Sequence, residues 1–157
     1  MAIQAAVDMA FSPGLHRTTS GMAQNGRMRT TREVVEAFFD AFNQHDVAAL
    51  VAFYAEGAVY HQMPTTPLRG RNAIRKSSKV AFGAIPDMGY RVINIIVDGE
   101  WGAAEWEGWG THRPPGGTAR PYRMNGCGFF QVRAGLIVLQ RGYWDSSTMA
   151  RQAGTAL

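Results

Sequence analysis

The hydrophobic period of the sequence changes near residue 88, and this change restricts the possible folds more than any other feature. From there to residue 144, apolar and polar residues alternate with a period of two, which is typical of half-buried β-strands. Short turn-forming clusters interrupt the alternation, so neighbouring strands should pair antiparallel. The pattern predicts strands over residues 88–98, 101–111, 120–133 and 136–144, separated at Asp98–Gly99, Pro114–Gly117 and Ala134–Gly135.

The residues before this stretch follow helical spacing instead. Apolar side chains from Val34 to Phe42 recur three and four positions apart, with acidic residues on the opposite face. This predicts a helix capped by Thr30 or Thr31, followed by a turn over residues 43–45. Asp46 can cap a second, short helix. Its inward-facing positions would be Val47, Leu50, Val51 and Tyr54.

A strand over residues 57–63, a proline-rich loop and a helix over residues 71–83 complete the first half. Asp145 or Ser146 can cap a final short helix after the last strand. Helices followed by a run of strands predict an α+β fold, with helices packed on one face of an antiparallel sheet.

Length and composition are consistent with one domain. The chain has 157 residues, of which we expect residues 1–28 to form a disordered tail and residues 29–157 to form the domain. The first residues lack the long apolar stretch of a signal peptide, and no run is long enough to span a membrane. The single cysteine, Cys127, excludes an internal disulfide framework and is compatible with the cytoplasm, where we expect the protein to be.

The net charge of +4 does not by itself predict a nucleic-acid partner. A nucleic-acid interface usually combines a basic stripe with exposed aromatic residues. One helix gathers Arg71, Arg75, Lys76 and Lys79, and we interpret this group as a solvated face. We therefore expect neither nucleic acid nor a membrane as a partner.

Several short stretches resemble those of a known superfamily. They are Phe38-Phe39-Asp40-Ala41-Phe42-Asn43, Tyr60-His61-Gln62-Met63-Pro64, Arg69-Gly70-Arg71-Asn72-Ala73-Ile74, Gly110-Thr111-His112 and Tyr143-Trp144-Asp145. With the order of elements, they are similar to the nuclear transport factor 2-like superfamily. Within it, residues 31–150 resemble the SnoaL-like polyketide cyclases and the limonene epoxide hydrolases. This resemblance implies a cone-shaped fold with a curved antiparallel sheet, an internal cavity and a homodimer formed through the outer sheet face.

The resemblance also implies a catalytic apparatus that this chain keeps only in part. Epoxide hydrolases of the family use two carboxylates bridged by an arginine, helped by a tyrosine and an asparagine. The helper positions fall on Tyr60 and Gln62, whereas the charged positions fall on Trp106, Gly108 and Gly142. Epoxide hydrolysis by the family's mechanism is therefore not expected unless other carboxylates substitute.

The candidate catalytic residues are Tyr60, Gln62, His61 and Asp145. Tyr60 would donate a hydrogen bond to a developing oxyanion, and Gln62 would orient the substrate or a water. His61 or Asp145 would move a proton, although strand alternation also allows His61 a packing role, and Asp145 can serve as a helix cap.

The candidate substrate-binding residues are mainly aromatic and aliphatic. Alternation turns Trp106 inward and Glu105 and Glu107 outward, unless a bulge reverses the strand. Glycines at 108, 126 and 142 should widen the space for a flat or cyclic guest. The alternative is an ordinary filled core. Together with Tyr60 and Gln62, the expected lining is Phe39, Phe82, Ile85, Trp106, Met124 and Trp144.

The remaining reactive side chains give little support for other chemistry. The histidines at 16, 45, 61 and 112 lack metal-binding spacing, so no metal and no cofactor is expected. Cys127 lies between two glycines and is interpreted as a small buried residue rather than a nucleophile.

Two functions remain open at this point, with a third held in reserve. The first is a cofactor-independent SnoaL-like enzyme that cyclises, isomerises or opens an epoxide in an apolar polyketide- or terpenoid-like molecule. The second is a non-catalytic protein that binds such a molecule. The third is a dimeric adaptor that binds protein through its outer sheet face.

Overall fold

The computed structural model describes residues 27–63 and 65–155. The predicted tail over residues 1–28 lies almost entirely outside the described residues, so its boundary with the domain stays a prediction. Among the described helices, none is both long and apolar enough to cross a membrane.

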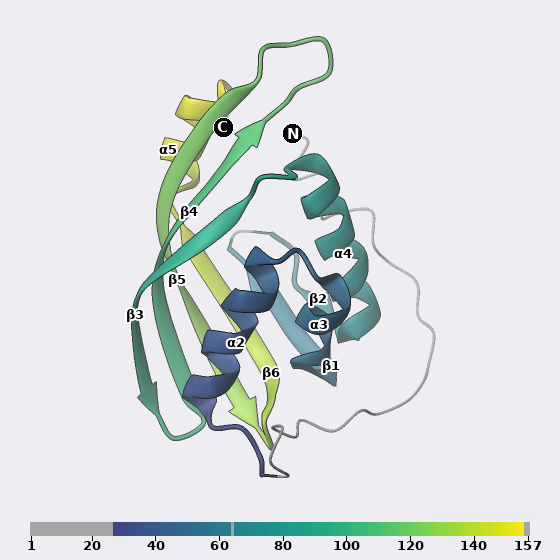
Figure 1. Cartoon of the computed structure of the whole chain (residues 1–157), viewed down its shortest axis with the longest axis vertical. Coiled ribbons are helices and arrows are strands. Elements are labelled where there is room, and N and C mark those ends of the chain that lie inside the picture. Colours follow the sequence, from purple (N-terminus) through teal and green to yellow (C-terminus); the bar gives the residue numbers. More distant parts are fainter. Residues whose placement is uncertain (1–26, 64, 156–157) are drawn as a thin grey trace.

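A six-stranded, strongly curved sheet forms the body of the protein (Figure 1). The strands lie in the order β2-β1-β6-β5-β4-β3. The four predicted strands of the second half are confirmed within one or two residues at their ends. The strands are β1 Tyr54–Gln62, β2 Leu68–Arg69, β3 Gly89–Asp98, β4 Trp101–His112, β5 Arg120–Arg133 and β6 Leu136–Trp144.

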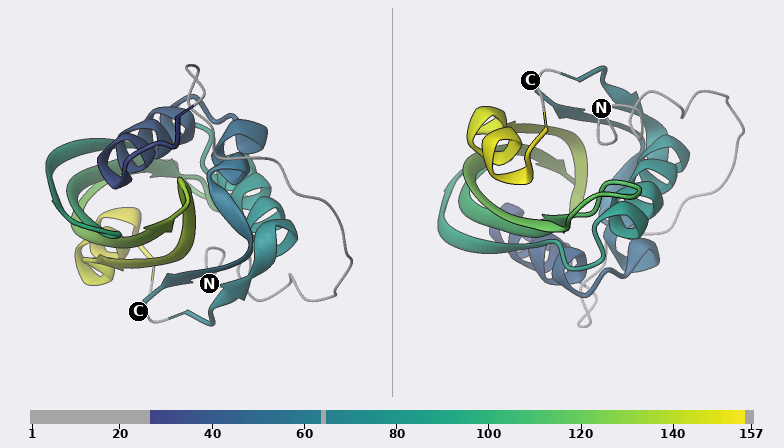
Figure 2. Two further views of the ribbon diagram at one scale, coloured as in Figure 1. Left: turned by 90° about the horizontal axis from the view of Figure 1, so that it is seen from below. Right: turned by 90° about the horizontal axis from the view of Figure 1, so that it is seen from above.

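The helices cover this sheet and close one of its ends. The sheet curves around α2, and α4 lies beside β1 and β2 (Figure 2). The predicted α+β arrangement is therefore confirmed. Within the described residues the helices are α2 Thr31–Asn43, α3 Val47–Ala52, α4 Gly70–Ala84 and α5 Ser146–Ala153.

Local side-chain caps fix where two of these helices begin. Thr30 caps α2 in a reciprocal capping box: its side chain accepts from the Glu33 N–H, and the Glu33 carboxylate accepts from the Thr30 N–H at 2.8 Å. Thr31, the other candidate cap, instead donates its hydroxyl to the Gly99 carbonyl at 2.7 Å. Asp46 caps α3 as predicted, by accepting from the Ala49 N–H at 3.0 Å.

Three sequence-based expectations about the first half need correction. Tyr54 is the first residue of β1 rather than an inward residue of the short helix, because α3 ends at Ala52. The short strand β2 replaces part of the expected loop by pairing with Val59 and Tyr60. In addition, β1 pairs with β6 in parallel, so the sheet is not purely antiparallel. Such a pairing between distant segments leaves no local signal in the sequence.

An aromatic cluster joins α2 to the sheet. Phe38 makes edge-to-face contacts with Phe39, Tyr54 and Phe130 at centroid distances of 5.4, 5.9 and 5.4 Å. This geometry is the preferred one for aromatic pairs and adds to the stabilisation from their burial. The cluster fixes the position of α2 against β1 and β5.

Large side chains on the concave face lie opposite glycines on the neighbouring strand. Tyr90 pairs with Gly108, and a Cβ at Gly108 would lie 2.9 Å from the Tyr90 ring. Trp106 pairs with Gly126 and occupies the space above it. The glycines at these positions therefore make room for the side chains that form the wall of the interior.

This arrangement predicts that Gly126→Ala destabilises the protein. A new Cβ would collide with the Trp106 ring and would lie 2.5 Å from the Tyr143 carbonyl oxygen. We expect a loss of about 1–3 kcal/mol in the free energy of unfolding, typical of overpacking in a core. Urea denaturation followed by tryptophan fluorescence measures this loss.

Gly57→Ala is the matched control, because Gly57 also lies in a strand but has no atom within 4 Å of an added Cβ. It should keep or slightly raise the stability. Equal losses in the two variants would show that the Trp106 contact is not the cause.

Candidate functional site

A partly open, mainly apolar pocket lies between α4, the concave face of the sheet and α5. Its volume is about 130 Å³, roughly the size that accommodates one benzene-sized ring. The lining residues are Tyr60, Gln62, Thr65, Leu68, Ser77, Ala81, Ala84, Ile85, Met88, Tyr90, Tyr122, Met124, Trp144 and Met149.

The polar groups of this pocket are neutral. Burial raises the pKa of Tyr60 to about 12, although a hydrogen bond with the Gln62 side chain acts in the opposite direction. Burial likewise raises the pKa of Tyr122 to about 12 and that of Tyr90 further. All three phenols are therefore protonated near pH 7 and can donate hydrogen bonds. Among the described residues that line the pocket, none is Asp, Glu, His, Lys or Arg.

Several of the residues expected to line the pocket do so. Tyr60 and Gln62 lie on β1 with their side chains on the pocket side, as the alternation predicted. They are joined there by Ile85, Met124 and Trp144. The structure therefore brings these five residues together around one space, while their roles in binding or catalysis stay predictions.

Contrary to the expectation from the sequence, three residues do not line the pocket: Phe39, Phe82 and Trp106. Phe39 and Trp106 both contact the ring of Tyr90, at centroid distances of 5.9 and 4.6 Å, and it is Tyr90 that faces the pocket. Phe82 stacks on His45 at 4.4 Å, on the other side of α4. The three residues belong to the core. The prediction failed because alternation identifies the face of a sheet on which a side chain lies, but not whether that side chain reaches the pocket.

The three glycines do not widen the pocket, which corrects a second expectation. Tyr90 and Trp106 take the space above Gly108 and Gly126. The Gln62 amide lies directly on Gly142, its pairing partner across β1 and β6, so a Cβ at position 142 would overlap it. These glycines therefore position pocket residues instead of leaving room for a bulky guest.

The expected proton carriers lie outside the lining. His61 points away from Tyr60 and Gln62 by strand alternation, in register with exposed Arg141. Asp145 is exposed and caps α5 by accepting from the Thr148 N–H at 2.9 Å. Hydrogen bonds from the Thr148 side chain and backbone hold the pKa of Asp145 below its usual value, so it is a carboxylate at neutral pH.

Glu105 and Glu107 lie on the outer face of the sheet, as expected if Trp106 points inward. Glu107 binds Arg91 at 2.9 Å and Arg123 at 3.2 Å, and these hydrogen bonds lower its pKa. Neither glutamate is available to replace the missing carboxylates in the pocket.

Sequence reasoning missed Tyr90 and Tyr122, the two additional phenols of the pocket. Tyr122 lies two residues before Met124 on β5, so the alternation that predicted Met124 would also have found Tyr122. Met88 and Met149 were missed because they lie outside the strands, where the alternation of inward and outward side chains does not apply.

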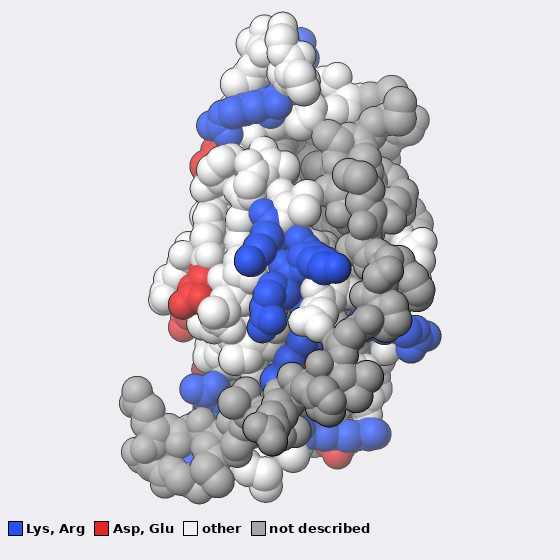
Figure 3. Space-filling model, turned by 90° about the vertical axis from the view of Figure 1, so that its right-hand side faces the viewer, with Lys and Arg blue, Asp and Glu red and all other residues white. Residues whose placement is uncertain are grey.

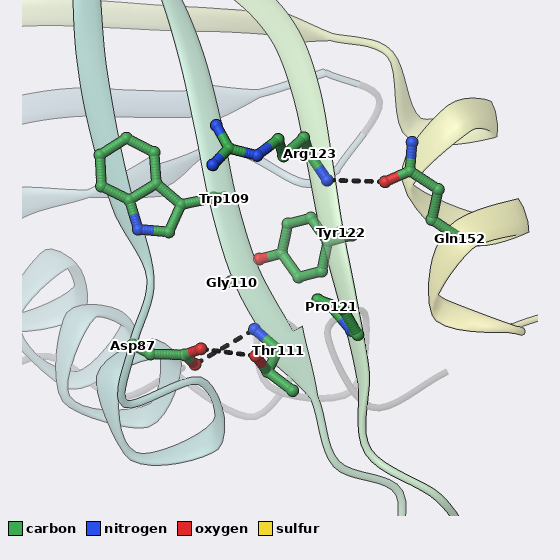
Figure 4. Close-up of a pocket in the computed structure, with 8 residues that line it drawn as sticks. All are labelled: Asp87, Trp109, Gly110, Thr111, Pro121, Tyr122, Arg123 and Gln152. Carbon is green, nitrogen blue, oxygen red and sulfur yellow. Dashed lines mark hydrogen bonds between the residues drawn. The ribbon is translucent and has the colours of Figure 1, made fainter.

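A second, more open groove of about 410 Å³ shares Tyr122 with the pocket (Figure 4). Its charged groups are already engaged within the protein. Asp87 accepts from the Thr111 N–H at 3.1 Å and pairs with Arg113, while Arg123 pairs with Glu107. The groove therefore offers less free hydrogen-bonding capacity than its size suggests.

The other reactive side chains form no further centre. In the part of the chain that the structure describes, no group of three His, Cys, Asp or Glu side chains could hold a metal ion. His45 accepts or donates a hydrogen bond at the Met88 carbonyl at 2.7 Å, and Cys127 is a half-buried free thiol on β5. The Nδ1 atom of His112 is buried without a hydrogen-bond partner in the structure.

Comparison with known proteins gives consistent matches. Residues 35–140 match the SnoaL-like domain family. The chain is 28% identical to IdmH, a candidate polyketide cyclase from Streptomyces antibioticus, with a TM-score of 0.71 over 81% of this chain and 100% of that one.

Two further solved structures support the fold. A protein from Catenulispora acidiphila with a ketosteroid isomerase-like fold has a TM-score of 0.73 at 20% identity, covering 81% of this chain and 96% of its own. An LEH-like epoxide hydrolase of M. tuberculosis has a TM-score of 0.68 at 23% identity, covering 78% and 88%. The expected cone-type fold of the nuclear transport factor 2-like superfamily is confirmed.

The position of Asp145 predicts that its carboxylate serves the helix and not the pocket. Asp145→Asn keeps a good capping side chain and removes the charge, so we expect unchanged ligand binding and turnover. Asp145→Ala removes the cap and should lower the melting temperature, as measured by circular dichroism. Loss of turnover in a stably folded Asp145→Asn variant would instead assign Asp145 to catalysis.

Proposed function

Because the chain belongs to the SnoaL-like domain family, we propose that it is a cofactor-independent enzyme acting on an apolar, polyketide- or terpenoid-like small molecule. The reaction would be a cyclisation, an isomerisation or an epoxide opening. The observation that supports this most is the neutral Tyr60 phenol beside Gln62, at the wall of a mainly apolar pocket. A fold alone does not fix a function, so the proposal depends on this pair.

In this proposal Tyr60 stabilises negative charge that develops on a substrate oxygen. A protonated phenol in a water-poor site donates a hydrogen bond that strengthens as the oxygen becomes an oxyanion. Gln62 can hold a carbonyl or hydroxyl of the substrate, since its amide both donates and accepts. Its position over Gly142 keeps this amide close to Tyr60.

Substrate positioning supplies the rest of the rate in this mechanism. Neither His61 nor Asp145 lines the pocket, so neither group is assigned a proton transfer in this mechanism. Tyr90 and Tyr122 offer two more neutral donors that can fix other oxygens of the substrate. A reactive molecule held in a productive shape can gain a large rate factor from orientation alone.

The methionines of the lining allow for a substrate larger than one ring. Met88, Met124 and Met149 each contribute to the wall, and methionine adapts its shape with little strain. Movement of these side chains would enlarge the volume of about 130 Å³ without a change in the sheet.

The alternative is a non-catalytic protein that binds a small molecule in the same pocket. The observation in its favour is the neutral lining, which offers no evident acid or base among the described residues. Binding without turnover is the result that this alternative predicts.

Tyr60→Phe separates the two functions. If Tyr60 stabilises an oxyanion, turnover should fall about 100-fold or more, while ligand affinity changes little. Turnover is measured by mass spectrometry on a panel of poly-β-ketone thioester analogues and small cyclic epoxides. Affinity is measured by isothermal titration calorimetry.

Tyr143→Phe is the matched control, because Tyr143 lies outside the pocket lining and the change removes only a hydroxyl while keeping the apolar ring on the outer sheet face. The native turnover should be flat between about pH 6 and 9, since the phenol that acts has a pKa of about 12. A bell-shaped profile with an apparent pKa near 7 would implicate a histidine and contradict this mechanism. Tight binding with no conversion by the native protein would support the alternative.

We also propose that two copies of the chain pair through the outer sheet face. Large apolar side chains are exposed there on four neighbouring strands, and Phe129 and Tyr143 contact each other edge-to-face at 6.0 Å. Isolated monomers rarely leave such a patch open to water. The patch consists of Ile93, Ile96, Trp101, Phe129 and Tyr143.

Phe129→Glu should convert this dimer into a monomer, because it places a charge in the middle of the buried patch. Size-exclusion chromatography with light scattering reports the mass. Val80→Glu is the control, since Val80 is 44% exposed, close to the 42% of Phe129, but lies on α4 away from the patch. A monomeric native protein would refute the proposal.

A further inference from the structure

The outward face of α4 carries a cluster of cations, and the helix itself contains no Asp or Glu. No Asp or Glu occurs between Glu56 and Asp87. Figure 3 shows Lys and Arg side chains gathered at the centre of this face of the molecule, with no Asp or Glu among them. We call the cluster the α4 basic face. It consists of Arg75, Lys76 and Lys79 on the helix and of Arg69, which directly precedes it at the end of β2.

Arg71 belongs to the same helix but has a structural role. It is buried, its Nε donates to the Tyr54 carbonyl at 2.5 Å, and its guanidinium lies 3.8 Å from Glu56. By contrast, within the described residues none of the four members of the α4 basic face forms an ion pair.

This arrangement is unfavourable for the helix by itself. Arg75 and Lys79 are four residues apart, and Lys76 and Lys79 are three apart, so like charges are neighbours on the helix surface. An anionic partner outside the chain would remove this penalty.

The pocket cannot supply that partner. Ser77 and Ala81 line the pocket, whereas Lys76 and Lys79 lie about 100° and 160° away around the helix. The cations therefore face solvent, on a different side of α4 from any ligand inside the pocket.

The chain's own carboxylates are also largely committed. Glu33, Asp87, Glu100 and Glu107 each pair with an arginine. Residues 1–26 contain one acid, Asp8, and one base, Arg17, so that segment adds no net negative charge.

We propose that the α4 basic face docks on an acidic surface of another protein. The cluster is compact and lies on a rigid helix, which suits a discrete acidic patch. A nucleic-acid interface would be expected to add exposed aromatic side chains, and of the large apolar residues on α4 only Val80 is exposed. Four cations are at the lower end of the clusters that bind anionic lipids, and the single exposed large apolar residue of α4, Val80, offers little anchoring in a membrane.

The test measures binding of fluorescently labelled poly-L-glutamate to the full-length protein by fluorescence anisotropy, at physiological ionic strength. Lys76→Glu/Lys79→Glu should weaken binding about tenfold or more. The control, Arg113→Glu/Arg151→Glu, reverses two exposed cations elsewhere and should change affinity about twofold at most. Each double variant changes the net charge by 2 × (−2) = −4, from +4 to 0.

Backbone NMR shifts provide a second readout, and the perturbations on addition of poly-L-glutamate should centre on α4. Equal weakening in both double variants would show a general charge effect and overturn the proposal. Absence of binding would also overturn it. Tighter binding of duplex DNA or phosphatidylserine vesicles than of poly-L-glutamate, dependent on Lys76 and Lys79, would assign the face to another class of partner.

Discussion

The interior of this protein depends on large side chains that lie opposite glycines across the sheet. Tyr90 faces Gly108, Trp106 faces Gly126, and Gln62 faces Gly142, each pair in direct register on neighbouring strands. Because these glycines have no Cβ, the large side chains can lie flat against the sheet and against each other, as the contact of 4.6 Å between Tyr90 and Trp106 shows. The wall of the pocket and the register of the sheet are therefore set by the same contacts.

This construction has a consequence for the chemistry of the pocket. Of the three side chains that fill glycine spaces, Tyr90 and Gln62 also line the pocket. The polar part of the lining consists of neutral phenols, an amide and two hydroxyls, and its apolar part includes three flexible thioethers. Burial keeps the phenols protonated, which makes them donors over the whole physiological pH range. A site of this kind favours an uncharged ligand with oxygen acceptors, and it disfavours a ligand whose charge would remain unpaired in the interior.

The sequence predicts the order of elements well, because each period is local and the turns between the last four strands are distinct. It also places Tyr60, Gln62, Met124 and Trp144 on the pocket side correctly, since alternation fixes the face of a strand. It fails for Trp106, because whether an inward side chain ends in the pocket or beneath Tyr90 depends on contacts between strands that are far apart in the chain. The parallel pairing of β1 with β6 could not be predicted either, because it joins two segments that are far apart in the chain.

Helix α4 connects the interior to the outer surface. Ser77 and Ala81 belong to the wall of the pocket, while Lys76 and Lys79 on other sides of the same turns face solvent. The helix packs mainly on β1, β2 and α3. The proposed docking surface and part of the pocket wall therefore belong to one helix.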